Sequence, residues 1–262
     1  MQIMDIMTQD IISVNKNDDL QHVMDLMDKH NISKVPAMAD GQLTGIVTDN
    51  KIADELGSVR NRKVPPSHMH ASTVMDRDYE PVYPQMDVRE ILQTVGEPGL
   101  TMLPVLENEI LIGVVTKADL LPLVDDARPV TDIMTSPVHT VKPGDRVVHA
   151  RRRLLDHDIA RLPVAVDGAP QGMISDMEIA FALADIKRSV PLGQQNHRLR
   201  ELHVEDAMRA PALVAGEERT IEEAARIMLD QSVGCLPIVD DEDMLQGIIT
   251  RTDLLRTLPD SL

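Results

Sequence analysis

The chain has 262 residues, 43 % hydrophobic and 26 % charged, which is the composition of a globular protein. Its net charge of −17 repels duplex DNA and anionic membranes on average, so we expect neither as a partner, although a local basic pocket can still bind a small anion. An aromatic content of 1 % argues against a site built on base stacking, and the single Cys235 excludes an internal disulfide. We also expect no metal site, no signal peptide, no membrane span and a cytoplasmic location.

The same pattern of predicted elements occurs four times along the chain. A leading motif comes first and contains a methionine: Met7, Met75, Met134 or Met208. A short β-rich segment and an amphipathic helix follow; in the second and fourth copies the helices start at the capping boxes Asp87–Glu90 and Thr220–Glu223. Next come two strands around a turn, the first with a central proline and the second with a central glycine, and then a short closing helix. Each copy is therefore a β-α-β-β-α repeat.

We predict four domains, at residues 1–57, 68–124, 128–187 and 202–262. A unit of about 60 residues is marginal as an independent fold, so the repeats should pair. The break near residue 128 favours two modules, residues 1–124 and 128–262, with basic, proline-containing linkers at 57–70 and 187–203 inside them.

The second strand of every repeat ends in Gly, two hydrophobic residues and Ser or Thr, and in repeats 2 and 4 an Asp follows three residues later. With the preceding proline strand, this motif resembles the CBS (cystathionine-β-synthase) domain, two of which form a Bateman module. The resemblance covers nearly the whole chain and implies an α/β protein of two Bateman modules, similar in layout to the gamma subunit of AMP-activated protein kinase. It also implies a pseudo-symmetric disc within one chain, or modules that pair between two chains as a homodimer.

The resemblance implies binding of adenosine-containing ligands in clefts between paired domains, and residue chemistry indicates where. A threonine hydroxyl can donate to phosphate, and an aspartate three residues later can accept from both ribose hydroxyls. The second and fourth repeats have this pair complete, as Thr116 with Asp119 and Thr250 with Asp253. The first repeat has Thr48 but Lys51, which has no acceptor, and the third has Ser175 with the longer Glu178. We therefore expect the first and third repeats to form weaker sites.

A second position also alternates between the repeats, and it is cationic in the repeats whose Thr–Asp pair is incomplete. Two residues before the strand proline lie Lys34 and Arg161 in repeats 1 and 3, but Met102 and Cys235 in repeats 2 and 4. In the family, basic residues at this position often bind phosphate from the partner domain. We therefore predict that Lys34 completes the Asp119 site and Arg161 completes the Asp253 site.

The function expected from these residues is non-catalytic. The protein would sense AMP, ADP or ATP, would need no other cofactor, and would signal to an unidentified regulated protein. One alternative is a binding module for S-adenosylmethionine or a thio-nucleoside, and another is a structural adaptor with vestigial pockets. Enzyme activity has little support, because the sequence shows no nucleophile–base pair and no phosphate-binding glycine loop. The acidic, Met-rich, stand-alone layout resembles archaeal members of the family.

The run Arg151–Arg153 lies in the predicted helix of the third repeat. Three consecutive residues cannot share one helix face, so the run is expected to form a mostly solvated face, and the alternative is that one arginine points toward the cleft or the module interface.

Overall fold

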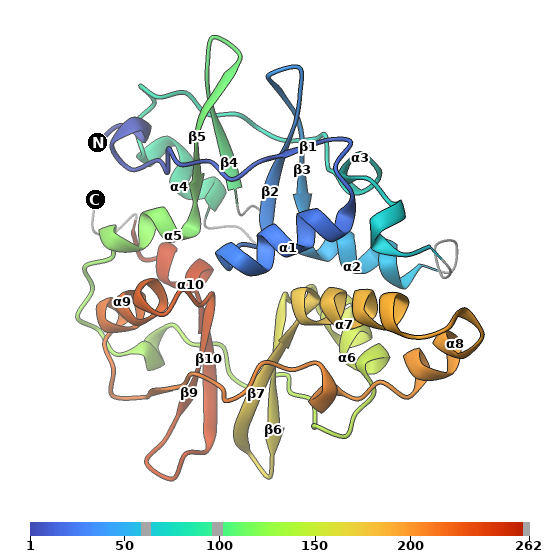
Figure 1. Cartoon of the computed structure of the whole chain (residues 1–262). Coiled ribbons are helices and arrows are strands. Elements are labelled where there is room, and N and C mark those ends of the chain that lie inside the picture. The colour runs from blue at the N-terminus through green and yellow to red at the C-terminus, as the bar shows by residue number, and fades with distance from the viewer. Residues whose placement is uncertain (59–63, 96–101, 259–262) are drawn as a thin grey trace. The chain divides into compact units, whose positions relative to one another are not determined.

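The computed structural model describes residues 1–58, 64–95 and 102–258. In these ranges each repeat follows the β-α-β-β-α order, and its two longer strands form an antiparallel hairpin (Figure 1). In repeats 2 and 3 the first β element is a single parallel bridge, Val82 to Val105 and Val141 to Val164. The predicted α/β class with four repeats is confirmed. Parts of the predicted domains and of the 57–70 linker, at residues 59–63, 96–101 and 259–262, lie outside the described residues.

The chain forms two compact units, and neither coincides with a predicted module. Unit 1 combines Met1–Ile11, Tyr79–Val138 and Leu213–Leu262, and therefore holds repeats 2 and 4. Its elements in repeat 2 are α4 (Arg89–Val95), β4 (Met102–Glu107), β5 (Ile110–Thr116) and α5 (Lys117–Leu120). Those in repeat 4 are β8 (Ala215–Gly216), α9 (Ile221–Asp230), β9 (Cys235–Val239), β10 (Leu245–Thr250) and α10 (Arg251–Leu255).

Unit 2 combines Ile12–Asp78 with His139–Ala212, and therefore holds repeats 1 and 3. Repeat 1 contributes β1 (Val14–Asn15), α1 (Leu20–His30), β2 (Lys34–Ala39), β3 (Gln42–Thr48) and α2 (Asp49–Gly57), followed by α3 (Ala71–Val74). Repeat 3 contributes α6 (Val147–Asp156), β6 (Arg161–Val166), β7 (Ala169–Ser175) and α7 (Asp176–Ser189), followed by α8 (Leu192–Arg200). The predicted disc concerns the placement of the two units, and it stays a prediction, as does the oligomeric state.

Each unit has an aliphatic core of its own. In unit 1 the core includes Leu103, Leu120, Ile221, Met228 and Leu254, all at most 3 % exposed. In unit 2 it includes Leu20, Met24, Ile52, Leu154 and Ile179, again almost fully buried. The methionines and leucines thus fill the volume that aromatic side chains occupy in most proteins.

The hairpin turns of unit 2 follow their sequence. Asp40–Gly41 and Asp167–Gly168 all have positive φ angles, between 50° and 91°. Both central residues of a type I′ hairpin turn need this conformation, which glycine adopts freely and aspartate tolerates.

The leading segments of the repeats, residues 1–8, 71–76, 130–135 and 204–209, are exchanged between neighbouring repeats. The segment of repeat 1 bridges a strand of repeat 2 (Thr8 to Val114), and that of repeat 2 bridges a strand of repeat 1 (Asp76 to Ile46). Repeats 3 and 4 exchange their segments in the same way, through Thr135 to Ile248 and Arg209 to Met173. Each unit therefore contains leading segments that belong, by sequence, to the repeats of the other unit.

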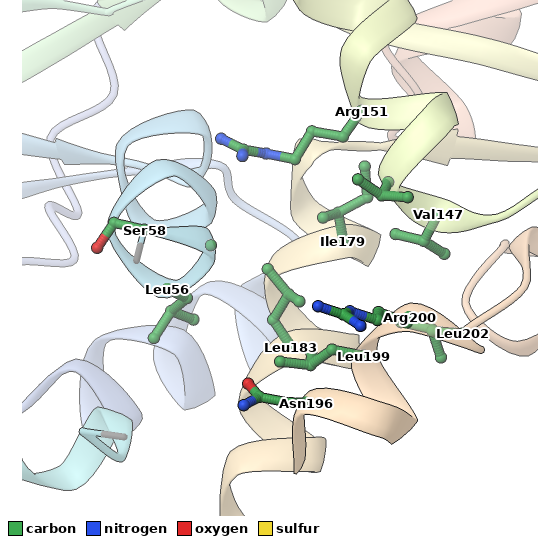
Figure 2. Close-up of a pocket in the computed structure, with 12 residues that line it drawn as sticks. Leu56, Ser58, Val147, Arg151, Ile179, Leu183, Asn196, Leu199, Arg200 and Leu202 are labelled. Carbon is green, nitrogen blue, oxygen red and sulfur yellow. The ribbon is translucent and has the colours of Figure 1, made fainter. Parts of the chain in front are cut away.

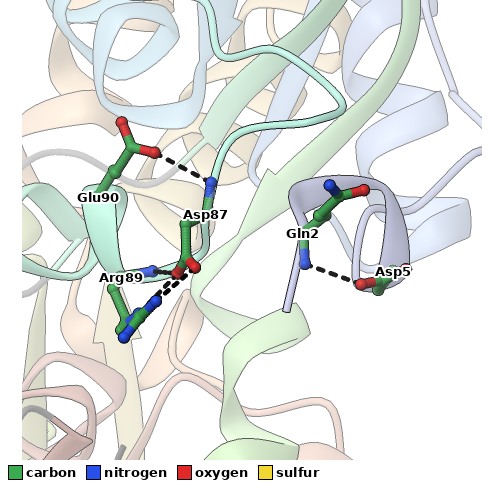
Figure 3. A network of polar contacts seen from close by, with 5 residues as sticks. All are labelled: Gln2, Asp5, Asp87, Arg89 and Glu90. Atoms are coloured by element: carbon green, nitrogen blue, oxygen red, sulfur yellow. Dashed lines mark hydrogen bonds and ion pairs between the residues drawn. The ribbon is translucent and has the colours of Figure 1, made fainter.

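The first residues of the chain lie beside Asp87 within unit 1, and Figure 3 shows the polar contacts within each of these two segments. Gln2 bridges Asp87, and its backbone N–H donates to Asp5 Oδ2 at 2.8 Å. The guanidinium of Arg89 donates to both oxygens of Asp87, at 2.9 and 2.7 Å, and these hydrogen bonds hold the pKa of Asp87 below its usual range. Glu90 accepts from the Asp87 backbone at 3.1 Å, but Asp87 accepts from Arg89 rather than Glu90, so only half of the predicted capping box forms.

The segment predicted as a linker, residues 187–203, is helical over most of its length. Helix α7 continues to Ser189, and α8 begins directly after Pro191. Proline is compatible with the start of a helix, because the first helical residues need no intrahelical donor.

Candidate functional site

The closing turns, residues 48–51, 116–119, 175–178 and 250–253, join the last strand of each repeat to its closing helix. In every turn the predicted hydroxyl residue is the N-cap of that helix. In repeats 2, 3 and 4 the acidic residue three positions later completes a capping box. The local sequence thus brings hydroxyl and carboxylate together, and the box fixes the orientation of the carboxylate.

In repeat 2 both oxygens of the Asp119 carboxylate are in use. Asp119 Oδ2 accepts from the Thr116 backbone N–H at 2.6 Å and from its hydroxyl at 2.7 Å. Asp119 Oδ1 accepts from the hydroxyl of Thr8, in the leading segment of repeat 1, at 2.7 Å. A carboxylate has about four acceptor positions, so a ligand that uses two of them must displace one of these three donors, and Thr8 is the donor that lies outside the turn.

In repeat 4 the corresponding carboxylate is more open. Asp253 Oδ2 accepts from the backbone N–H and the hydroxyl of Thr250, at 2.8 and 2.7 Å. Among the described residues, the other oxygen has one charged neighbour, Arg256 Nη1 at 3.9 Å. This oxygen can accept from a ligand without first losing a hydrogen bond within the protein.

In repeats 1 and 3 the altered turns face a complementary charge on the exchanged leading segment. Lys51 Nζ lies 3.8 Å from Asp76 Oδ2, and Glu178 Oε1 lies 3.5 Å from Arg209 Nε. In repeat 1 the Thr48 hydroxyl donates to Asn50, the neighbour of Lys51. In repeat 3 the Ser175 hydroxyl donates to Glu178, as its counterparts do.

The residue that follows the methionine of each leading motif was missed in the sequence analysis. It is Thr8, Asp76, Thr135 or Arg209; Thr8 donates a hydrogen bond to Asp119, Asp76 pairs with Lys51, and Arg209 pairs with Glu178. The signal was present in the leading motifs, but it becomes visible only when each motif is compared with the turn of the neighbouring repeat.

The motif glycines explain why the leading segments approach the strands so closely. A Cβ atom on Gly45 would lie 2.6 Å from the carbonyl oxygen of Asp76, and one on Gly172 would lie 2.7 Å from that of Arg209. The recurring methionines of the leading motifs lie against the same glycines, with Met75 Cγ 3.0 Å from the Gly45 position. Glycine and methionine therefore form one packing contact in each repeat.

The predicted phosphate cations Lys34 and Arg161 lie in unit 2, near two acidic residues of the closing helices. Burial lowers the pKa of Lys34, and the charge of Asp49 opposes that shift. Burial raises the pKa of Asp49, while Lys34 and Arg161 lower it. Burial also raises the pKa of Asp176 to about 6, and Asp49 adds to this shift. Lys34 and Arg161 thus already balance buried carboxylates within their own unit.

The first residue of each closing helix also differs between the units. It is Asp49 or Asp176 in unit 2, but Lys117 or Arg251 in unit 1. Lys117 is buried and its Nζ donates to Thr252 Oγ1 at 2.6 Å, whereas Arg251 Nε donates to the carbonyl of Val233 at 3.1 Å. The first helical position beside a closing turn is therefore cationic in unit 1 and acidic in unit 2.

The pairings of Lys34 with Asp119 and of Arg161 with Asp253 each join residues of different units, and they stay predictions. The helix dipole at the turns of unit 1 is smaller than the dipole of a full-length helix, since α5 and α10 span only Lys117–Leu120 and Arg251–Leu255.

No helix in the described ranges is long and apolar enough to cross a membrane. Within these same residues, no group of three or more His, Cys, Asp and Glu side chains is arranged to hold a metal ion.

In comparison with known proteins, all four repeats match the same protein family. The family described as "CBS domain" matches residues 3–58, 71–126, 130–185 and 204–260. A curated relative, protein MJ1225 of Methanocaldococcus jannaschii, is 23 % identical over 264 residues, which are 94 % of each chain. Its crystal structure, for which homology to g-AMPK has been suggested, matches with a TM-score of 0.83 at 22 % identity over 98 % of this chain and 99 % of the other. A Pyrococcus horikoshii protein matches with a TM-score of 0.62 at 19 % identity, over 98 % of this chain and 100 % of the other.

Proposed function

The chain belongs to the CBS domain family, and on that basis we propose that it is a non-catalytic regulatory protein that binds adenosine nucleotides at the closing turns of repeats 2 and 4. The observation that carries this proposal is the carboxylate of Asp253: its capping box holds Oδ2, and its Oδ1 has Arg256 Nη1 as a charged neighbour at 3.9 Å, beyond hydrogen-bond distance. Such an oxygen can accept from the ribose hydroxyls of a nucleoside.

The contrast between the two units supports two sites rather than four. In unit 1 the closing helices begin with cationic residues, which favour a phosphate. In unit 2 they begin with Asp49 and Asp176, and the turn residues Lys51 and Glu178 are engaged in ion pairs with the leading segments. A phosphate near those turns would meet negative charge, and a ribose would compete with an existing ion pair.

The Thr116 and Thr250 hydroxyls can serve a phosphate only after a rearrangement. Each has one proton, and in this structure it is donated to the neighbouring carboxylate at 2.7 Å. When ribose hydroxyls donate to that carboxylate, the threonine hydroxyl is free to rotate toward the phosphate. Ribose and phosphate recognition would then be coupled within one turn.

Ligand binding in repeat 2 would act on the leading segment of repeat 1. A ribose hydroxyl competes with Thr8 for Asp119 Oδ1, so a bound nucleotide favours states in which this segment is released from the turn. A ligand shifts such an equilibrium only by its differential affinity for the two states. The exchanged segment is thus the element through which the protein would signal to a regulated partner.

Isothermal titration of the stripped protein with AMP, ADP, ATP and S-adenosylmethionine tests the proposal. We expect about two phosphate nucleotides per chain, about one for Asp253→Asn, and none for the Asp119→Asn, Asp253→Asn double variant. Glu223→Gln is the matched control, because Glu223 completes the same kind of capping box in α9 of repeat 4, away from the closing turn. Two nucleotides bound to the double variant would refute the assignment. Preference for the sulfonium ligand would favour the thio-nucleoside alternative, and no heat from any ligand would favour the adaptor.

A further inference from the structure

A cavity of about 210 Å³ lies inside unit 2, and no closing-turn residue is among the described residues that line it (Figure 2). Its walls are the C-terminal end of α2 and parts of α6, α7 and α8. Helix α8 lies between the third and fourth family matches, which end at 185 and resume at 204. One wall of the cavity is therefore built by a segment that is not part of any of the four repeats.

The inner surface of this cavity is aliphatic. Leu56, Val147, Ile179, Leu183 and Leu202 contribute to it, and each is at most 9 % exposed. No aromatic ring is among its described lining residues, so the cavity offers no stacking partner for a nucleobase. An aliphatic group gains the most from this surface, because burial of apolar area is not directional.

The polar groups of the cavity are cationic or neutral. Arg151 and Arg200 line it together with Asn196 and Ser58, whereas no acidic side chain is among the described lining residues. Figure 2 shows the guanidinium ends of both arginines extending from their helices toward α2. In a chain with a net charge of −17, this is a local concentration of positive charge.

Arg151 has hydrogen-bonding capacity that the protein leaves unused. It extends from α6 to form an ion pair with Asp54 of α2. Its Nε is buried and is the one buried side-chain polar atom without a partner among the described residues. An orphaned buried donor is costly, and because this Nε has almost no exposed surface, it gains a partner only when the side chain shifts. Arg200 is exposed and forms no ion pair with a described residue.

We propose that this cavity binds a small organic carboxylate with an unbranched aliphatic body. The carboxylate would lie between Arg151 and Arg200, whose planar guanidinium groups match its geometry. The aliphatic body would lie against the leucine side chains. The volume corresponds to roughly seven groups of the size of a water molecule, which suits the tail of a medium-chain carboxylate such as octanoate. This site is separate from the nucleotide sites proposed above and does not depend on them.

Calorimetric titration of the full chain with octanoate, octan-1-ol and octylamine tests the proposal. We expect octanoate to bind more tightly than octanol, and octylamine to bind least. Arg200→Gln should weaken octanoate binding about tenfold, as expected for the loss of one charge-assisted hydrogen bond, and leave octanol unchanged. Arg198→Gln is the matched control, because Arg198 is exposed on the same helix but does not line the cavity.

A second variant tests the cavity itself. Val148 lines it and is 56 % exposed, so Val148→Phe should reduce its volume without disturbing the core, as circular dichroism would verify. Octanoate binding should then be lost while AMP binding is retained. Four results would each overturn the proposal. The first two are no octanoate binding to the native chain and equal affinities for octanoate and octanol. The others are equal effects of Arg198→Gln and Arg200→Gln, and loss of octanoate binding in the Asp119→Asn, Asp253→Asn double variant. The nucleotide assignment is measured with AMP and survives each of these results, so the two proposals fail separately.

Discussion

Substitution of Gly45 by alanine tests the close approach of the leading segments to the strands. The new Cβ would lie 2.6 Å from the carbonyl oxygen of Asp76, closer than a side-chain carbon approaches a backbone atom. This carbonyl accepts from the N–H of Ile46 at 2.8 Å, and the N–H of Asp76 donates to the carbonyl of Ile46, also at 2.8 Å. The leading segment must therefore move, and both hydrogen bonds weaken.

The expected loss of stability follows from the weakening of those two backbone hydrogen bonds. Each backbone hydrogen bond contributes about 0.5–1.5 kcal/mol net, so we expect Gly45→Ala to lower the free energy of unfolding by about 1–3 kcal/mol. Gly144→Ala is the matched control, because a Cβ at that position would have no atom within 4 Å and the φ of Gly144 is not positive. Alanine reduces the entropy of the unfolded chain equally at both positions, so this contribution cancels in the comparison.

Urea unfolding followed by far-UV circular dichroism measures the difference. We expect the midpoint of Gly45→Ala to fall below that of Gly144→Ala, with an unchanged denaturant slope. Equal midpoints would show that the leading segment contributes nothing at this contact, and the reasoning for the other three motif glycines would fail with it.

The closing turns and their neighbours lead to three further predictions. Thr8→Val removes a competing donor from the repeat 2 carboxylate and should raise nucleotide affinity there a few-fold in calorimetry, whereas Thr135→Val should not; equal effects would contradict the competition. Lys51→Asp should lower the free energy of unfolding by about 0.5 kcal/mol through like-charge repulsion with Asp76, because an exposed ion pair contributes about 0–1 kcal/mol. Adding Asp76→Lys restores an ion pair of reversed sign, so urea unfolding of the double variant should show the native stability. The pKa of Asp176 is raised to about 6, so its folded form holds a proton more tightly than its unfolded form and stability falls as pH rises from about 4 through 6. Asp176→Asn should therefore stabilise the chain by about 1–2 kcal/mol at pH 7.5, after allowance for partial exposure, and this advantage should vanish near pH 4 in chemical unfolding.

Local sequence determined the elements and the chemistry of the turns. The hairpins, the Asp-Gly turns and the Thr220–Glu223 capping box follow from residues within a few positions of one another, which sequence patterns report directly. The hydroxyl and carboxylate of each closing turn are three residues apart, so their contact follows from the start of a helix. The fourfold repetition made these local inferences stronger than any single motif would have been.

Tertiary structure alone decided which segments meet. Thr8 and Asp119 are 111 residues apart, and no local pattern predicts that the leading segment of one repeat lies on the strand of its neighbour. The same holds for the carboxylates that surround Lys34, for the ion pair between Arg151 and Asp54, and for the cavity walled by α8. These contacts depend on how buried faces pack against one another over long sequence separations, because many pairings satisfy the same hydrophobic pattern and only the complete packing selects one of them.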